Sequence, residues 1–250
     1  NDVDSKDNVA QKEIKALIAH EQELLNTSVL NTLFNYNTDV VWVYRGEVVD
    51  IASKAAFNKW LSVICDQVYC DTPVYINEMV NKHKPSSAIS TARVNFLAHL
   101  LDNAAEQNLG FEDGKFPPEK TIYLTLLQNT GIHKRIGREY LMDTPTEESF
   151  LPLWNTCEAF LDSTKEKPRK LGELIKILRS RPFKLKQGVI DLWLPAFLII
   201  KKNDYSLYND TGIYIHTITR EVLDIMQKSP AGFSVKAFNV EGVKLDLFSK

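Results

Sequence analysis

The sequence predicts a mainly α-helical protein with small antiparallel β-hairpins. Apolar residues recur every three or four positions through most of the 250 residues, which is the periodicity of amphipathic helices. Two β-rich runs flank Arg45-Gly46, and two more flank the turn at residues 209–212, as expected of hairpins. No segment of about 20–50 residues repeats along the chain, so a solenoid is not expected.

The N-terminal part, residues 1–145, is expected to form a helical domain with one β-hairpin near residues 40–51. Apolar spacing and capping residues predict helices over about 9–34, as one long helix or two joined ones, and over 53–68, 72–80, 85–101 and 119–129. The segment 110–118 is a predicted loop, and 132–146 is the least regular stretch. We place a domain boundary near Asp143-Thr144-Pro145.

The C-terminal part, residues 146–250, is expected to form a second domain. Helices are predicted over 150–161, 171–181 and 187–202, with a charged connector at 163–170. A hairpin over 205–216, a helix capped by Thr217 or Thr219, and strands over 233–240 and 243–248 complete the pattern. This order of helices, hairpin and strands predicts a winged-helix-like domain.

The predicted helix 187–202 is apolar on nearly all sides. Such a helix is normally buried, and Pro195 should kink or divide it. In a winged helix it would occupy the position that reads DNA bases, which requires polar side chains. The hairpin tip Asn209-Asp210 is acidic and would repel phosphates. The domain is therefore expected to pack or to contact proteins, not to read DNA sequence.

The net charge, the cysteine count and the length of the apolar runs exclude several classes of protein. The net charge of −2 lends no support to a dedicated nucleic-acid binder, which is more often strongly basic, although a local basic patch stays open. Three cysteines and no CxxC pair indicate a reducing cytoplasm without a disulfide framework. The longest apolar run, around 192–200, is too short for a membrane span, and residues 1–7 do not resemble a signal peptide. The missing initiator Met suggests a segment of a longer polypeptide.

No complete catalytic motif is present, so we do not expect an enzyme. The phosphate-cradling GxxxxGK[ST], the GxSxG elbow, HExxH and GxGxxG are all missing, and no two of the five histidines share a metal-ligand spacing. We therefore expect no cofactor and no metal. Cys65 or Cys157 could pair with a distant histidine as nucleophile and base. Both lie on predicted apolar helix faces, which favours buried, structural cysteines.

Two basic groups are candidate sites for phosphate or a nucleic-acid backbone. In the first, Lys82-His83-Lys84 precedes a helix start at 85–87 and Arg93 projects from that helix, so free backbone amides and cations could meet an anion. A solvated loop with a capping serine is the simpler alternative. The second group follows Gly131, where cations also complement a helix dipole. It consists of His133, Lys134, Arg135 and Arg138.

A third, more dispersed basic group surrounds the predicted helix 171–181. Its cations would need to share one face to contact phosphates, and Glu166 and Glu173 dilute them. It consists of Lys165, Lys167, Arg169, Lys170, Arg179, Arg181, Lys184 and Lys186.

Three stretches carry a resemblance to a known family. They are 61–101 (LSVICDQVYCDTPVYINEMVNKHKPSSAISTARVNFLAHLL), 182–200 (PFKLKQGVIDLWLPAFLII) and 207–240 (LYNDTGIYIHTITREVLDIMQKSPAGFSVKAFNV). Together they resemble a region of very large bacterial P-loop ATPases of phage-defence (BREX-like) systems, outside the ATPase motifs. The resemblance implies an accessory helical and winged-helix-like region of a multidomain defence protein.

Three functional hypotheses follow. The first is a non-catalytic interaction segment of a larger ATPase. Its partners would be the rest of the parent polypeptide, other defence-system proteins, or DNA through backbone contacts, with no membrane. The second is a small-ligand or phosphate-binding regulatory domain that uses the helix start between Lys82 and Arg93. The third is a cysteine-dependent enzyme.

Overall fold

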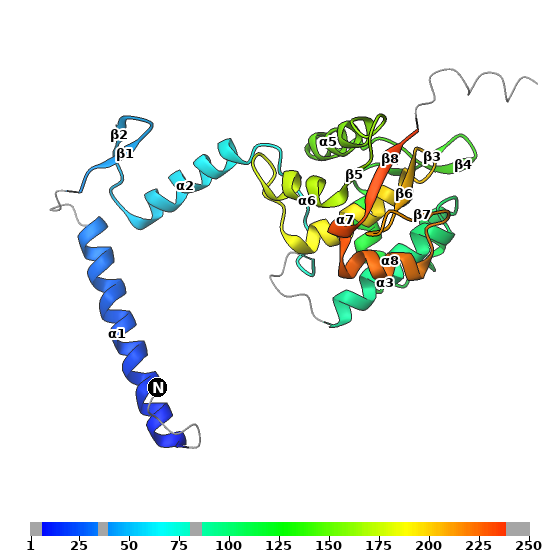
Figure 1. The fold of residues 1–250 in the computed structure, drawn as a ribbon. Helices are drawn as coiled ribbons and strands as arrows, with labels where there is room; N and C mark the ends of the chain where they lie inside the picture. Colours follow the sequence, from blue (N-terminus) through cyan, green and yellow to red (C-terminus); the bar gives the residue numbers. More distant parts are fainter. Residues whose placement is uncertain (1–6, 35–39, 81–86, 239–250) are drawn as a thin grey trace, which may run out of the picture. The chain divides into compact units, whose positions relative to one another are not determined.

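The computed structural model describes residues 7–34, 40–80 and 87–238. The chain divides into two compact units, Asn1–Gln67 and Val68–Lys250 (Figure 1). The boundary that we placed near residue 145 therefore falls inside the second unit. The physical reason is a shared core, because Leu126 before that point and Trp193 after it belong to one buried hydrophobic cluster.

The first unit contains two helices and a hairpin, as predicted. They are α1 (Asn8–Phe34), β1 (Trp42–Tyr44), β2 (Glu47–Val49) and α2 (Lys54–Val68), whose last residue begins the second unit. Arg45 and Gly46 both have positive φ, 52° and 87°, which matches the right-handed twist of a two-residue hairpin. The Ser53 hydroxyl accepts the backbone N–H of Ala56 at 3.1 Å, so the predicted cap is confirmed.

Aromatic rings hold the first unit together. Phe34 at the end of α1 stacks on Trp42, and Trp42 lies 4.8 Å from Phe57 of α2. Tyr44 meets Trp60 edge to face at 5.3 Å. Neither helix contains a buried residue, so the apolar side chains along α1 remain uncovered within the described part of the chain.

Six α-helices build the second unit. They are α3 (Ser87–Asp102), α4 (Pro118–Tyr123), α5 (Leu151–Asp162), α6 (Leu171–Arg179), α7 (Gln187–Ile200) and α8 (Arg220–Lys228). Shorter helical turns are η1 (Gln107–Gly110), η2 (Leu124–Gln128), η3 (Glu148–Phe150) and η4 (Pro230–Gly232). The Thr219 hydroxyl accepts the N–H of Val222, which confirms the predicted cap of α8.

The second unit also contains a four-stranded antiparallel sheet and a separate hairpin. The sheet has the order β5-β8-β6-β7, from β5 (Arg169–Lys170), β8 (Ser234–Ala237), β6 (Tyr205–Tyr208) and β7 (Tyr214–Ile215). The separate hairpin is β3 (His133–Ile136) with β4 (Glu139–Met142). The fold class is thus confirmed as mainly α with small antiparallel strand pairs.

Helix α7 lies in the core of the second unit (Figure 1), as its sequence predicts. Ten of its residues are buried, and Trp193 and Phe197 pack against Trp154 of α5. Pro195 lies inside this unbroken helix, so of the two expected outcomes, a kink or a division, the division does not occur. A proline costs a helix roughly 3 kcal/mol, whereas each large apolar side chain stabilises by about 1.5–3 kcal/mol on burial. Burial on every side therefore outweighs the proline.

Four of the predicted elements differ in the structure or lie, wholly or partly, outside the described residues. Residues 72–80 form an irregular segment instead of a helix, held partly by the Thr72 hydroxyl, which donates to the carbonyl of Phe183. Residues 133–142 form a hairpin instead of an irregular stretch. The predicted strand 243–248 lies outside the described residues. Of the predicted strand 233–240, the structure describes 233–238, of which residues 234–237 form a strand.

Candidate functional site

The predicted phosphate site at the start of α3 is only partly described. Lys82, His83 and Lys84 lie outside the described residues. Arg93 is mostly buried: its Nη1 lies 3.3 Å from Oδ2 of Asp191, and its Nη2 donates to Oε1 of Gln227 at 3.1 Å. A phosphate at Arg93 would have to displace a carboxylate that already holds the guanidinium. The contacts thus favour a structural role, linking α3 to α7 and α8.

The second predicted basic group lies on the β3–β4 hairpin and separates into two pairs. His133 is buried, and its Nδ1 lies 2.9 Å from the hydroxyl of Tyr123. Burial lowers the pKa of His133, so its neutral form is favoured. Lys134 forms an ion pair with Asp143 at 2.8 Å, which lowers the pKa of that carboxyl. These two side chains therefore support the hairpin from its base.

Arg135 and Arg138 lie at the exposed tip of the same hairpin. Gly137, with φ of 65°, makes the turn, and Arg135 Nε donates to the Gly137 carbonyl at 3.2 Å. Register places Arg135 opposite Tyr140 and Ile136 opposite Glu139. The four residues 135–138 around this turn therefore carry two guanidinium groups. The neighbouring Glu139 adds one carboxylate. Of the eight predicted site residues, these two keep an exposed cationic group in the described structure.

Two of the eight cations in the third basic group form ion pairs with neighbouring carboxylates. Arg169 lies 2.7 Å from Glu173 and over the ring of Phe160 at 4.6 Å. The contact with Arg169 lowers the pKa of Glu173. Lys165 pairs with Asp162 at 3.1 Å. These two pairs reduce the net positive charge of the group.

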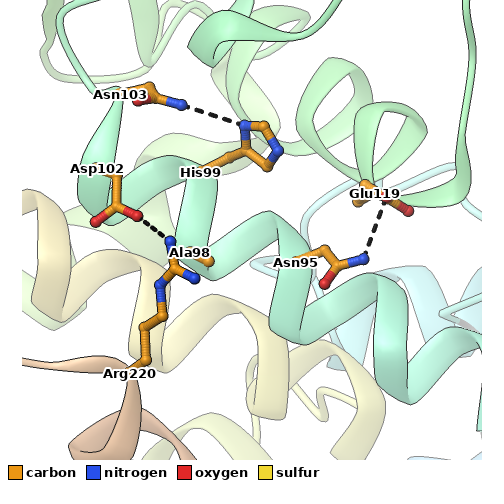
Figure 2. Close-up of a pocket in the computed structure, with 7 residues that line it drawn as sticks. All are labelled: Asn95, Ala98, His99, Asp102, Asn103, Glu119 and Arg220. Carbon is orange, nitrogen blue, oxygen red and sulfur yellow. Dashed lines mark hydrogen bonds and ion pairs between the residues drawn. The ribbon is translucent and has the colours of Figure 1, made fainter.

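A polar pocket that sequence reasoning missed lies between α3, the first turn of α4 and the start of α8 (Figure 2). Its volume is about 180 Å³. The polar side chains that line it are Asn95, His99, Asp102, Asn103, Glu119 and Arg220. Asn95, His99 and Asp102 are spaced i, i+4 and i+7 on α3, and Asn103 follows the helix directly, so a polar stripe was the available signal. The partners from α4 and α8 could not be inferred from spacing.

Four direct contacts define the walls of the pocket. His99 Nδ1 lies 3.0 Å from the carbonyl of Leu109, and its ring stacks on Phe111 at 4.0 Å. Asn95 Nδ2 donates to Glu119 Oε1 at 3.3 Å. Arg220 pairs with Asp102 on the opposite side, as Figure 2 shows. The pocket thus gathers two carboxylates, an imidazole, two carboxamides and one guanidinium.

The cysteines differ from expectation in one respect. Cys157 is buried as predicted; Trp193 Nε1 lies 3.4 Å from its Sγ, and burial raises its pKa to about 12. Cys65 is exposed, because α2 has no buried face to receive it. Within the described residues, no three His, Cys, Asp or Glu side chains are grouped so as to hold a metal ion. No described helix is both long and apolar enough to cross a membrane.

Comparison with known proteins adds no relative to this picture. The chain matches no protein-family model, no curated protein and no solved structure.

Proposed function

We propose that the chain is a non-catalytic interaction segment of a larger multidomain ATPase, of the BREX-like phage-defence kind that its sequence resembles, and that it acts in the cytoplasm. Free thiols at Cys65, Cys70 and Cys157 are consistent with a reducing compartment. Partners would be the rest of the parent polypeptide, other defence-system proteins or a nucleic-acid backbone.

The observation that carries the proposal is the topology around α7. The order β5, α6, α7, β6, β8 and the spatial order β5-β8-β6 support a winged-helix-like arrangement with β7 and α8 as insertions. In such a domain α7 would read DNA bases, but here it is buried on all sides. Contacts with partners must therefore come from other surfaces.

The tip of the β3–β4 hairpin is the surface that best fits a nucleic-acid backbone. Arg135 and Arg138 are exposed there and flank the turn at Gly137. Guanidinium groups match phosphate geometry, and such contacts position a protein without reading sequence. The uncovered apolar side chains of α1, among them Leu17 and Leu25, suit a protein partner instead.

The nucleic-acid contact is tested with a random-sequence duplex and the double variant Arg135→Glu/Arg138→Glu, using fluorescence anisotropy from 25 to 200 mM salt. We expect weak binding by the wild type, a loss of about tenfold or more in the variant, and a salt slope shallower by about 2. The charge-matched control is Lys59→Glu/Lys228→Glu, which alters exposed lysines on α2 and α8. Absence of binding by the wild type, or an equal loss in both variants, rejects the hairpin contact.

A further inference from the structure

The pocket between α3, α4 and α8 has the size of a single functional group. Its volume of about 180 Å³ is below the roughly 300–1,000 Å³ of sites for cofactors and drug-sized ligands. All its lining residues belong to the second unit, so the site is complete within it. An occupant must therefore be small, or be the end of one side chain.

The tautomer of His99 is set by its neighbours. A carbonyl oxygen can only accept, so the 3.0 Å contact with the Leu109 carbonyl places the proton on Nδ1 of the neutral ring. The alternative, in which Asn103 Nδ2 donates to Nδ1, is longer at 3.3 Å and would leave two acceptors facing each other. In the neutral ring, Nε2 is then an acceptor. Figure 2 shows it on the side of the ring away from Asn103.

Glu119 adds a negative charge to the same side of the pocket. Its described hydrogen-bond partner is Asn95 Nδ2, a neutral donor, at 3.3 Å. Because a carboxylate only accepts, this bond orients the Asn95 amide and leaves Oδ1 as its remaining polar atom. No ion pair of Glu119 occurs among the described residues. Its position in the first turn of α4 is favourable for a carboxylate, but no described cation neutralises its charge.

The pocket's cation is already engaged. Arg220 Nη2 donates to Oδ2 of Asp102, and this contact raises the pKa of the guanidinium. The groups that remain to face an occupant are mainly hydrogen-bond acceptors, and their net charge is negative. They are Nε2 of His99, the Glu119 carboxylate and the second oxygen of Asp102. An anion would meet repulsion here, whereas a positively charged donor would find several acceptors.

We propose that this pocket binds a cationic hydrogen-bond donor, an alkylammonium or guanidinium group, against Glu119 and His99 Nε2. The group could be carried by a free small amine or by a lysine or arginine side chain of a partner. The proposal is independent of the nucleic-acid contact at the β3–β4 hairpin, which lies on other residues.

The experiment is an NMR titration that follows the His99 Cε1–H signal. The probes are agmatine as a free amine and guanidine, N-acetylarginine methylamide as a peptide side chain, and butyrate as an anion. We expect saturable shifts with at least one of the cationic probes and none with butyrate. Saturation by agmatine alone assigns a free small amine, whereas saturation by the arginine amide assigns a partner's side chain.

Variants separate a specific site from general attraction to an acidic surface. Glu119→Gln should weaken binding about tenfold, because charge-assisted hydrogen bonds are about twice as strong as neutral ones. Glu112→Gln, an exposed carboxylate outside the pocket, should leave binding unchanged. Arg220→Gln removes the pocket's own cation and should tighten binding of the cationic probes. The proposal is overturned if no cationic probe saturates, if butyrate binds equally well, or if the Glu119 and Glu112 variants behave alike.

Discussion

Arg93 on α3 forms an ion pair with Asp191 on α7, with Nη1 and Oδ2 3.3 Å apart and both side chains more than four-fifths buried. The pair connects two stretches that the sequence predicts to be separate domains. It also occupies the only described cation of the predicted phosphate site at the start of α3.

Breaking this pair should destabilise the second unit. Arg93→Met leaves Asp191 mostly buried without its cation, and we expect a loss of about 2–3 kcal/mol in the free energy of unfolding. Urea denaturation measures it. The control, Lys115→Met, removes the fully exposed pair with Glu112 and should cost less than about 0.5 kcal/mol. Equal effects of the two substitutions would show that the Arg93 pair contributes no more than a surface pair.

Helix α7 should respond to truncation as a core helix. Leu194 is 1% exposed, and Leu194→Ala should cost about 2–5 kcal/mol through lost burial and a residual cavity. Ile225 of α8 is 58% exposed, so Ile225→Ala is a matched truncation that should change stability far less. Thermal and urea unfolding give both values. A Leu194 variant as stable as the wild type would contradict the buried position of α7.

Stability should fall in mild acid because of His133. Burial lowers its pKa in the folded state, so the unfolded chain takes up a proton first as the pH falls. The stability that neutral His133 provides is complete above its unfolded pKa, near 6.5, and decreases below it. His133→Gln keeps a polar group for Tyr123 but cannot be protonated. Urea unfolding between pH 7.5 and 5 should show a steeper loss in the wild type; parallel curves would rule this out.

Thiol reactivity should rank the three cysteines in the native protein. Cys157 is fully buried with its pKa raised to about 12, so it should stay unmodified by iodoacetamide at pH 7.5. Cys65 and Cys70 are exposed and should react, with Cys70 slower because Asp71 raises its pKa. Peptide mass spectrometry after timed quenching gives the rates. Rapid labelling of Cys157 in folded protein would revive the hypothesis of a cysteine nucleophile.

Local patterns in the sequence predicted most of the regular elements. The caps at Ser53 and Thr219 and the hairpin turn at Arg45-Gly46 depend on neighbouring residues, and each occurs as expected. Prediction was wrong where local signals conflict with packing. The helix predicted over residues 72–80 does not form, because the Thr72 hydroxyl instead donates a hydrogen bond to the distant carbonyl of Phe183. Residues 133–142 lack strong alternation, and their hairpin is held at its base by the buried His133 and Tyr123.

The sequence by itself determined that α7 is a core helix, because a surface that is apolar on every side has no stable place in water. It also determined which short motifs are missing. Only the tertiary structure decided which charged side chains are paired and which stay exposed. Arg93 pairs with Asp191 and Lys134 pairs with Asp143. Arg135 and Arg138 remain exposed. The tertiary structure alone assembled the pocket, which joins Asn95 to Arg220. Which side chains are buried follows from the number of apolar residues and from their spacing along the sequence. Ion pairs and pockets depend instead on which distant residues the fold brings together.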